Sequence, residues 1–193
     1  VEGDDKQAPD KGGQERFRKM RNLNFTSTIW EAYLAMEFYP TVFIEQYDGL
    51  QGKIRPYGII GVGAFRFNPK TKDDNGNWVE LQPLRTEGQG FAEYPDRKPY
   101  KLTQLEVPMG FGLKYYIKEN MFVGFEVLHR KLFTDYVDDV STDYIDPALF
   151  YNYLSPADAA MAEQLNYRGT FPLPRSAMTG EVRGAPKEND VFF

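Results

Sequence analysis

The chain has 193 residues, a net charge of −5, an aromatic content of 16% and no cysteine. The length suits one domain, the acidic balance gives no reason to expect nucleic acid binding, and the lack of cysteine excludes a disulfide scaffold, a thiolate metal site and a cysteine nucleophile. No apolar run approaches the roughly 18 residues that a transmembrane helix needs, so helical membrane spans are excluded as well.

Two strands are predicted in the first third of the chain. Residues 26–39 alternate between apolar and polar side chains, and residues 54–67 form a glycine-rich run with apolar residues on both faces. Because successive side chains of a strand point to opposite faces, a period of two predicts β-structure. The connector between the two strands contains Pro40 and the turn pair Asp48-Gly49, and it is longer than a tight turn.

The clearest pattern lies in a predicted hairpin with strands at 102–117 and 121–133. One of its faces is wholly apolar, and the other carries small or charged residues. The apolar face consists of Leu105, Val107, Met109, Phe111, Leu113 and Tyr115 on the first strand, with Met121, Val123, Phe125 and Val127 on the second. A soluble barrel would turn this face inward, whereas an outer-membrane barrel would turn it to lipid. The hairpin alone fits both.

The remaining segments, 68–100 and 134–190, are polar and are predicted as long loops. Within the second one, Ser155 and Pro156 have the residue types that begin a helix, and residues 191–193 look like the start of one more strand. The predicted connections between strands therefore differ greatly in length: those at 68–100 and 134–190 are long, whereas the turn between the two strands of the hairpin is short. Such asymmetry is typical of barrels with short periplasmic turns and long extracellular loops.

Several motifs resemble the PorG-like family of outer-membrane barrels, which is associated with the type IX secretion machinery of the Bacteroidota. They occur in the family's order over nearly the whole chain. They are Arg21-Asn22-Leu23, the run from Tyr57 to Pro69, the run from Leu81 to Gly90, Glu126 with Arg130, the run from Phe133 to Thr142, and the terminal run from Arg183 to Asp190. The connector before residue 54 is longer than the family's pattern leads us to expect.

The resemblance implies an all-β fold, an eight-stranded antiparallel up-and-down transmembrane β-barrel in the outer membrane. This chain would supply its middle-to-C-terminal part, with about three strands before Val1 and a final strand after Phe193. The implied function is that of a non-enzymatic component of a protein secretion machine, in contact with outer-membrane lipid and docked to a periplasmic ring of PorK-like lipoprotein and PorN-like subunits. The alternative is a soluble or secreted β-barrel that binds a small apolar ligand.

Charged residues on the faces that would avoid lipid are predicted to fill the barrel lumen as ion pairs, since an eight-stranded barrel has room for little but side chains. These residues are Glu31, Glu37, Glu106, Lys114, Glu126 and Arg130. Among them, Glu106 and Lys114 on one strand and Glu126 and Arg130 on the next are expected to form at least one cross-strand ion pair. A gated polar path is the alternative interpretation.

The connector before residue 54 carries an apolar and aromatic set with little nearby to bury it. Such clusters often mark contact surfaces, so Phe43, Ile44 and Tyr47 are predicted to bind the periplasmic partner. The rival interpretation places them in the lipid interface as part of an aromatic girdle.

No residue pattern points to catalysis, a metal or another cofactor, and no small-molecule substrate is expected. His129 is the only histidine, so neither a multi-histidine metal site nor a catalytic triad is indicated. The acidic residues after Thr134 do not match the spacing of a known calcium loop.

Overall fold

The computed structural model describes residues 1–7, 19, 21–44, 53–169, 175–184 and 190–192. The chain divides into two compact units. We call residues 30–66, 103–133 and 189–193 the long-strand unit, and residues 1–29, 67–102 and 134–188 the helix-containing unit. The structure confirms the coarse fold class, since most of its regular elements are strands in antiparallel sheets.

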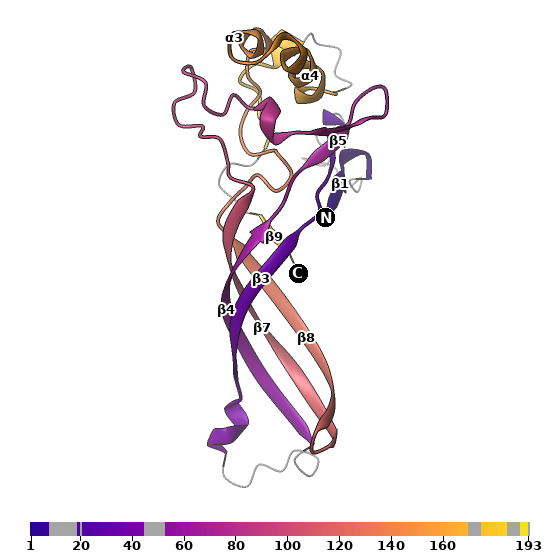
Figure 1. Cartoon of the computed structure of the whole chain (residues 1–193), viewed down its shortest axis with the longest axis vertical. Coiled ribbons are helices and arrows are strands. Elements are labelled where there is room, and N and C mark those ends of the chain that lie inside the picture. Colours follow the sequence, from indigo (N-terminus) through magenta and orange to yellow (C-terminus); the bar gives the residue numbers. More distant parts are fainter. Residues whose placement is uncertain (8–18, 20, 45–52, 170–174, 185–189, 193) are drawn as a thin grey trace. The chain divides into compact units, whose positions relative to one another are not determined.

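The long-strand unit is one antiparallel sheet in the order β3-β4-β7-β8-β9. Its strands are β3 (Trp30–Phe38), β4 (Ile54–Arg66), β7 (Thr103–Lys118), β8 (Met121–Leu132) and the short β9 (Val191–Phe192). The 3-10 helix η2 (Pro40–Phe43) follows β3. Figure 1 shows the four long strands side by side with a common twist. They lie where the sequence predicts strands near 26–39, 54–67, 102–117 and 121–133.

The first predicted strand is divided between two sheets. Thr26 belongs to the short strand β2 (Asn24–Thr26), which pairs with β1 (Glu2–Asp4) and β5 (Lys70–Lys72). The backbone of Ser27 exchanges hydrogen bonds with Val1, and its hydroxyl accepts one from the Asn68 amide. These bonds continue the pairing of β2 with the N-terminal segment as far as Ser27, and β3 begins at Trp30 in the other sheet.

The register shows which residues of β4 share a face with the charged residues of β3. Glu31 lies opposite Phe65, and Glu37 lies opposite Ile59. Residues that face each other across a ladder point to the same side of the sheet. Tyr57 on β4 therefore lies on the same face of the sheet as Glu31 and Glu37, a direction that the sequence had left undecided. Its ring lies against Gly112 on β7, where a Cβ atom would collide with it.

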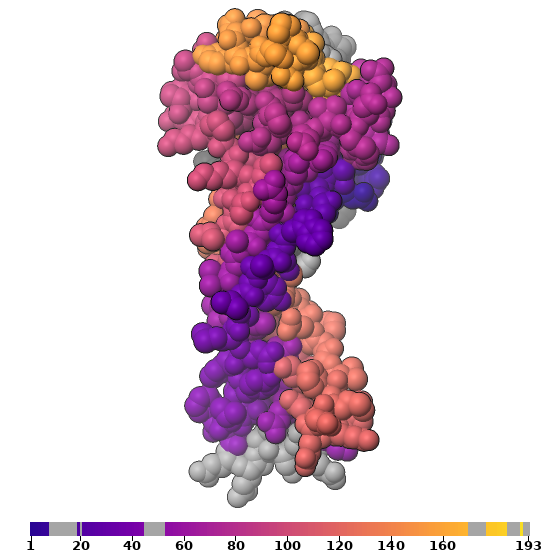
Figure 2. Space-filling view, viewed as in Figure 1, coloured from indigo at the N-terminus to yellow at the C-terminus, as the bar shows by residue number. Residues whose placement is uncertain are grey.

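The opposite face of this sheet is apolar and exposed. Nine large side chains on it have 55–82% of their surface accessible. They are Trp30, Leu34, Met36, Ile60, Val62, Leu105, Phe111, Val123 and Phe125. Figure 2 shows the segment of β3, in indigo to violet, at the surface of the molecule. Exposed apolar surface of this extent marks an interaction with a membrane, a ligand or another protein.

The helix-containing unit is built from the two segments that were expected as loops. It has a second antiparallel sheet in the order β1-β2-β5-β6, with β6 at Trp78–Glu80. Among its described residues, the helices include η1 (Asp5–Gln7), η3 (Gln82–Leu84), η4 (Pro147–Leu149), α3 (Phe150–Tyr153), α4 (Pro156–Asn166) and η5 (Arg175–Met178). None of the described helices has the length and hydrophobicity needed to cross a membrane.

A buried apolar cluster holds this unit together. It contains Leu81, Leu84, Phe91, Ile145, Phe150, Ala159, Ala162 and Leu165. The first three come from the segment before β7 and the other five from the segment after β8. Helix α4 begins as its sequence predicts, with the Ser155 hydroxyl accepting a hydrogen bond from the Asp158 amide. The two segments thus form a packed core of their own.

Candidate functional site

Two ion pairs connect strands that are not neighbours on the polar face of the long-strand unit. Arg130 on β8 donates from Nε and Nη2 to both carboxylate oxygens of Glu31 on β3, at 2.8 and 2.7 Å. In a flat sheet, β3 and β8 would lie about 14 Å apart, since neighbouring strands are about 4.8 Å apart. Side chains stand roughly perpendicular to a sheet, so this contact requires the sheet to curve toward its polar face.

The second ion pair lies closer to the β7–β8 turn. Lys114 on β7 pairs with Glu37 on β3, and its ammonium also donates to the Tyr39 hydroxyl at 2.7 Å. The rings of Tyr57 and Phe122 lie 4.7 and 5.1 Å from the Lys114 nitrogen. The ammonium is therefore enclosed by one carboxylate, one hydroxyl and aromatic faces, which all favour a cation.

Neither of the remaining two carboxylates of the predicted set forms an ion pair with another described residue. Glu126 accepts a hydrogen bond from the Tyr57 hydroxyl at 2.7 Å. Glu106 is fully buried, and neither of its carboxylate oxygens has a hydrogen-bond partner among the described residues.

The predicted pairing within the β7–β8 hairpin does not occur. The register places Glu106 opposite Leu132, Lys114 opposite Gly124, and Glu126 opposite Gly112. Arg130 lies opposite Pro108. Each charged residue of the hairpin thus faces an uncharged one, and both cations reach across the curved sheet to β3 instead.

Sequence reasoning missed the tyrosines of this face. Tyr39 and Tyr57 complete the surroundings of Lys114 and Glu126, and their rings are 5.6 Å apart. The position of Tyr57 within the glycine-rich strand could have indicated that its side chain lies on the polar face. Apolar residues occur on both faces of that strand, however, so the sequence did not show in which direction Tyr57 points.

Of the predicted partner-binding residues, Phe43 and Ile44 lie in and just after η2. They are 74% and 55% exposed, and the Phe43 ring lies 5.7 Å from that of Phe38. Tyr47 lies outside the described residues. The described part of the connector therefore presents an exposed apolar surface.

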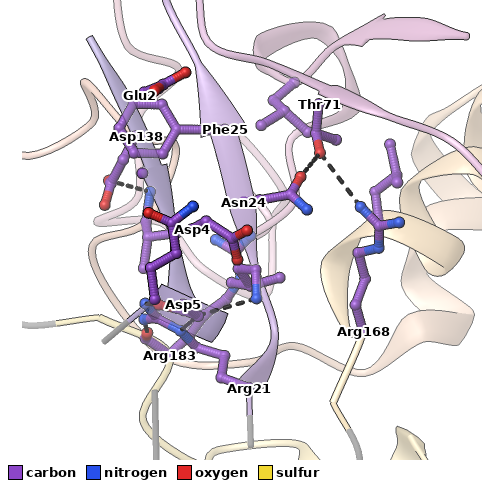
Figure 3. A pocket seen from close by; sticks show the side chains of 16 residues that line it. Glu2, Asp4, Asp5, Arg21, Asn24, Phe25, Thr71, Asp138, Arg168 and Arg183 are labelled. Carbon is purple, nitrogen blue, oxygen red and sulfur yellow. Dashed lines mark hydrogen bonds and ion pairs between the residues drawn. The ribbon is translucent and has the colours of Figure 1, made fainter. Parts of the chain in front are cut away.

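A pocket of about 300 Å³ lies in the helix-containing unit (Figure 3). Arg21 makes a bidentate ion pair with Asp5 on one side of it, at 2.8 and 2.9 Å. On another side Thr71 bridges Asn24 and Arg168. These groups largely satisfy one another, and the described residues contain no cluster of acidic or histidine side chains suited to a metal ion.

A buried charged network ties three parts of the helix-containing unit together. Arg183 donates to a carboxylate oxygen of Glu87 at 2.9 Å and to the backbone carbonyl of Asp139 at 2.6 Å. Glu87 also accepts from the amides of Ser141 and Thr142, at 3.0 and 2.9 Å. All three charged side chains are almost completely inaccessible to solvent.

Asp139 is the second carboxylate that faces this one guanidinium. It accepts hydrogen bonds from the hydroxyls of Thr86 and Tyr100, at 2.5 and 2.6 Å. Burial raises the pKa of Asp139 to about 6, although Arg183 and the two hydroxyls act in the opposite direction. Two carboxylates thus share one cation, and the Glu87 charge adds to the cost of ionising Asp139.

The stability of the helix-containing unit is therefore expected to depend on the protonation of Asp139. The folded state binds this proton more tightly than the unfolded chain does, so the free energy of unfolding falls as pH rises from about 4 to about 6. The difference between the pKa values of Asp139 in the folded and the unfolded chain corresponds to at most about 3 kcal/mol in the free energy of unfolding. Asp139→Asn should remove this slope, because an amide does not titrate there and asparagine tolerates the positive φ of 65° at this residue.

The measurement is denaturant unfolding at pH 5 and pH 7, followed by Trp78 fluorescence in a Trp30→Phe background. Each unit contains one of the chain's two tryptophans, so Trp78 alone then reports on the helix-containing unit. Identical pH profiles for the parent and the Asp139→Asn variant would contradict the expectation.

No family model, curated protein or solved structure matches this chain in comparisons with known proteins.

Proposed function

We propose that the long-strand unit is part of an eight-stranded outer-membrane β-barrel, and that the protein is a non-enzymatic component of a type IX protein secretion machine. The observation that carries the membrane proposal is the orientation of the sheet. Its concave face holds the ion pairs of Glu31 and Glu37, whereas its other face exposes large apolar side chains. A barrel in lipid is expected to have polar residues inside and an apolar band outside, and the orientation of this sheet supports the proposal for that reason.

The curvature supports the proposed strand number. The interior of an eight-stranded barrel is just wide enough for side chains to fill it. Arg130 and Glu31 meet across two intervening strands, as side chains on facing walls of such a lumen would. The alternative, a soluble barrel with an apolar ligand cavity, would need Leu105, Phe111 and Phe125 inside, and these side chains are at least 62% exposed.

The membrane proposal is tested by a charge placed on the apolar face. Phe111→Arg is expected to destabilise the folded protein in lipid by about 2–4 kcal/mol if the side chain lies near the bilayer midplane. The matched control is Val182→Arg, which changes an exposed apolar residue of the helix-containing unit.

The readouts are detergent-dependent extraction and the shift in gel mobility between unboiled and boiled protein. The parent and Val182→Arg should show the folded mobility, and Phe111→Arg should lose it at a lower temperature. Release of the parent protein into the soluble fraction without detergent would overturn the membrane proposal.

The role in secretion rests on the motif resemblance, and we further propose that Phe43 and Ile44 contact the periplasmic ring. Both are exposed and apolar, as anchors of a protein contact are before binding. Replacing both by serine should weaken co-purification with a PorN-like ring subunit at least tenfold, with no change in folded gel mobility. Trp78→Ser, at an exposed aromatic residue of the other unit, is the control. Undiminished co-purification of the double variant would refute the contact.

A further inference from the structure

The charged residues of the four long strands are divided between the two faces of the long-strand unit by their sign. Strands β3, β4, β7 and β8 contain four carboxylates, and the register places all of them on the concave face. Arg66 and Lys131 lie on the apolar face, opposite Trp30 and Val107. Lys118, the last residue of β7, lies at the turn. Among the described strand residues, the apolar face therefore carries cations and no carboxylate.

Arg66 and Lys131 lie at the same end of this sheet. Arg66 is the last residue of β4 and pairs with the first residue of β7, and Lys131 precedes the last residue of β8, so both are far from the β7–β8 turn. Both residues are exposed. No described residue forms an ion pair with either of them. The partner that these two charges favour is therefore an anion from outside the chain.

The length of β4 places this end of the sheet at the level of the lipid headgroups. From Ile54 to Arg66 an extended strand rises about 40 Å, and a tilt of about 40° reduces this to about 30 Å across the membrane. The apolar band of an outer-membrane barrel is about 25 Å tall, and aromatic residues flank it. Trp30, which is 75% exposed, lies opposite Arg66 and matches that position.

The chemistry of the headgroup layer identifies the anion. Lysine and arginine at the edge of an apolar surface keep their stems on it and extend the charged group into the polar layer. The anion that lipids supply in that layer is phosphate, which arginine binds through two parallel hydrogen bonds. We infer that Arg66 and Lys131 bind the phosphate groups of anionic lipids in the leaflet farther from the β7–β8 turn. This inference rests on the proposed barrel, because a barrel in lipid brings headgroups to these residues.

Fluorescence quenching by brominated lipids tests the inference, with the full chain reconstituted into phosphatidylcholine vesicles. Brominated phosphatidylglycerol is compared with brominated phosphatidylcholine, which carries a phosphate but no net charge. Trp30 reports on Arg66 in a Trp78→Phe background, since the chain contains two tryptophans. For Lys131 the reporter is Phe133→Trp, at an exposed position two residues away, in a background with both original tryptophans replaced by phenylalanine.

Each reporter should show about a fivefold preference for the anionic lipid, the ratio that one cation near an anionic surface supplies. Arg66→Gln should reduce the preference at Trp30 below about twofold, Lys131→Gln should do the same at the second reporter, and Arg66→Lys should keep most of it. Arg55→Gln is the matched control. Arg55 lies on the same strand as Arg66, but on the concave face and over the Tyr116 ring, so its replacement should change neither preference. In an uncharged detergent, where no lipid phosphate is present, none of these substitutions at Arg66 and Lys131 should change stability.

Equal quenching by the two lipids in the parent, or an unchanged preference in Arg66→Gln and Lys131→Gln, would overturn the inference. Loss of the preference in millimolar inorganic phosphate at constant ionic strength would overturn it as well, because the two residues would then bind free phosphate rather than a lipid. If neither brominated lipid quenches Trp30, the barrel proposal itself fails. If both quench it equally, the barrel proposal stands and this inference alone fails.

Discussion

Replacing Arg183 by methionine is expected to destabilise the helix-containing unit by about 3–5 kcal/mol, the cost of removing one partner from a buried ion pair. The change leaves Glu87 and Asp139 buried without their cation, and it removes the donor to the Asp139 carbonyl. The measurement is the free energy of unfolding from Trp78 fluorescence in the Trp30→Phe background.

Two further variants separate the electrostatic cause from a loss of packing. Arg168→Met removes an arginine whose ion-pair partner Asp74 is exposed and 3.8 Å away and whose hydrogen bond to the Thr71 hydroxyl is 3.3 Å long, so it should cost no more than about 1 kcal/mol. Adding Glu87→Gln to Arg183→Met should restore part of the lost stability, because it removes one uncompensated buried charge. Equal costs for Arg183→Met and Arg168→Met would refute the assignment of the network.

Replacing Arg130 by methionine is expected to destabilise the long-strand unit by at least about 2 kcal/mol. It leaves the Glu31 carboxylate without its bidentate partner on the concave face. The pair keeps some contact with solvent, so the cost should lie below that of Arg183→Met. Trp30 fluorescence in a Trp78→Phe background follows this unit alone.

The adjacent residue provides the control for Arg130. Lys131 lies opposite Val107 on the other face of the hairpin, and Lys131→Met should leave stability unchanged or raise it. Adding Glu31→Gln to Arg130→Met should recover stability. If Lys131→Met were costly and Arg130→Met harmless, the strand would be displaced by one residue and every assignment of a face would be reversed.

The alternation at residues 102–133 made the hairpin and its faces predictable. Side-chain direction in a strand depends only on position parity, so the sequence placed Glu106, Lys114, Glu126 and Arg130 on one face without knowledge of their neighbours. Their partners were not predictable in this way. The choice of Glu31 for Arg130 depends on strand order and curvature, which bring together residues 99 positions apart.

Local patterns were therefore enough to predict the long strands, the apolar and polar faces of the β7–β8 hairpin and the start of α4, because each depends on residues that are close along the chain; they left the faces of β4 undecided. Which charges pair, and that the two segments expected as loops contribute residues 81–91 and 145–165 to a shared core, became clear only from the folded structure. Neither segment has a regular apolar period, and the partners of Arg183 come from positions 44 and 96 residues away. Burial of such groups is favourable only once all parts are assembled, so no local pattern can reveal it.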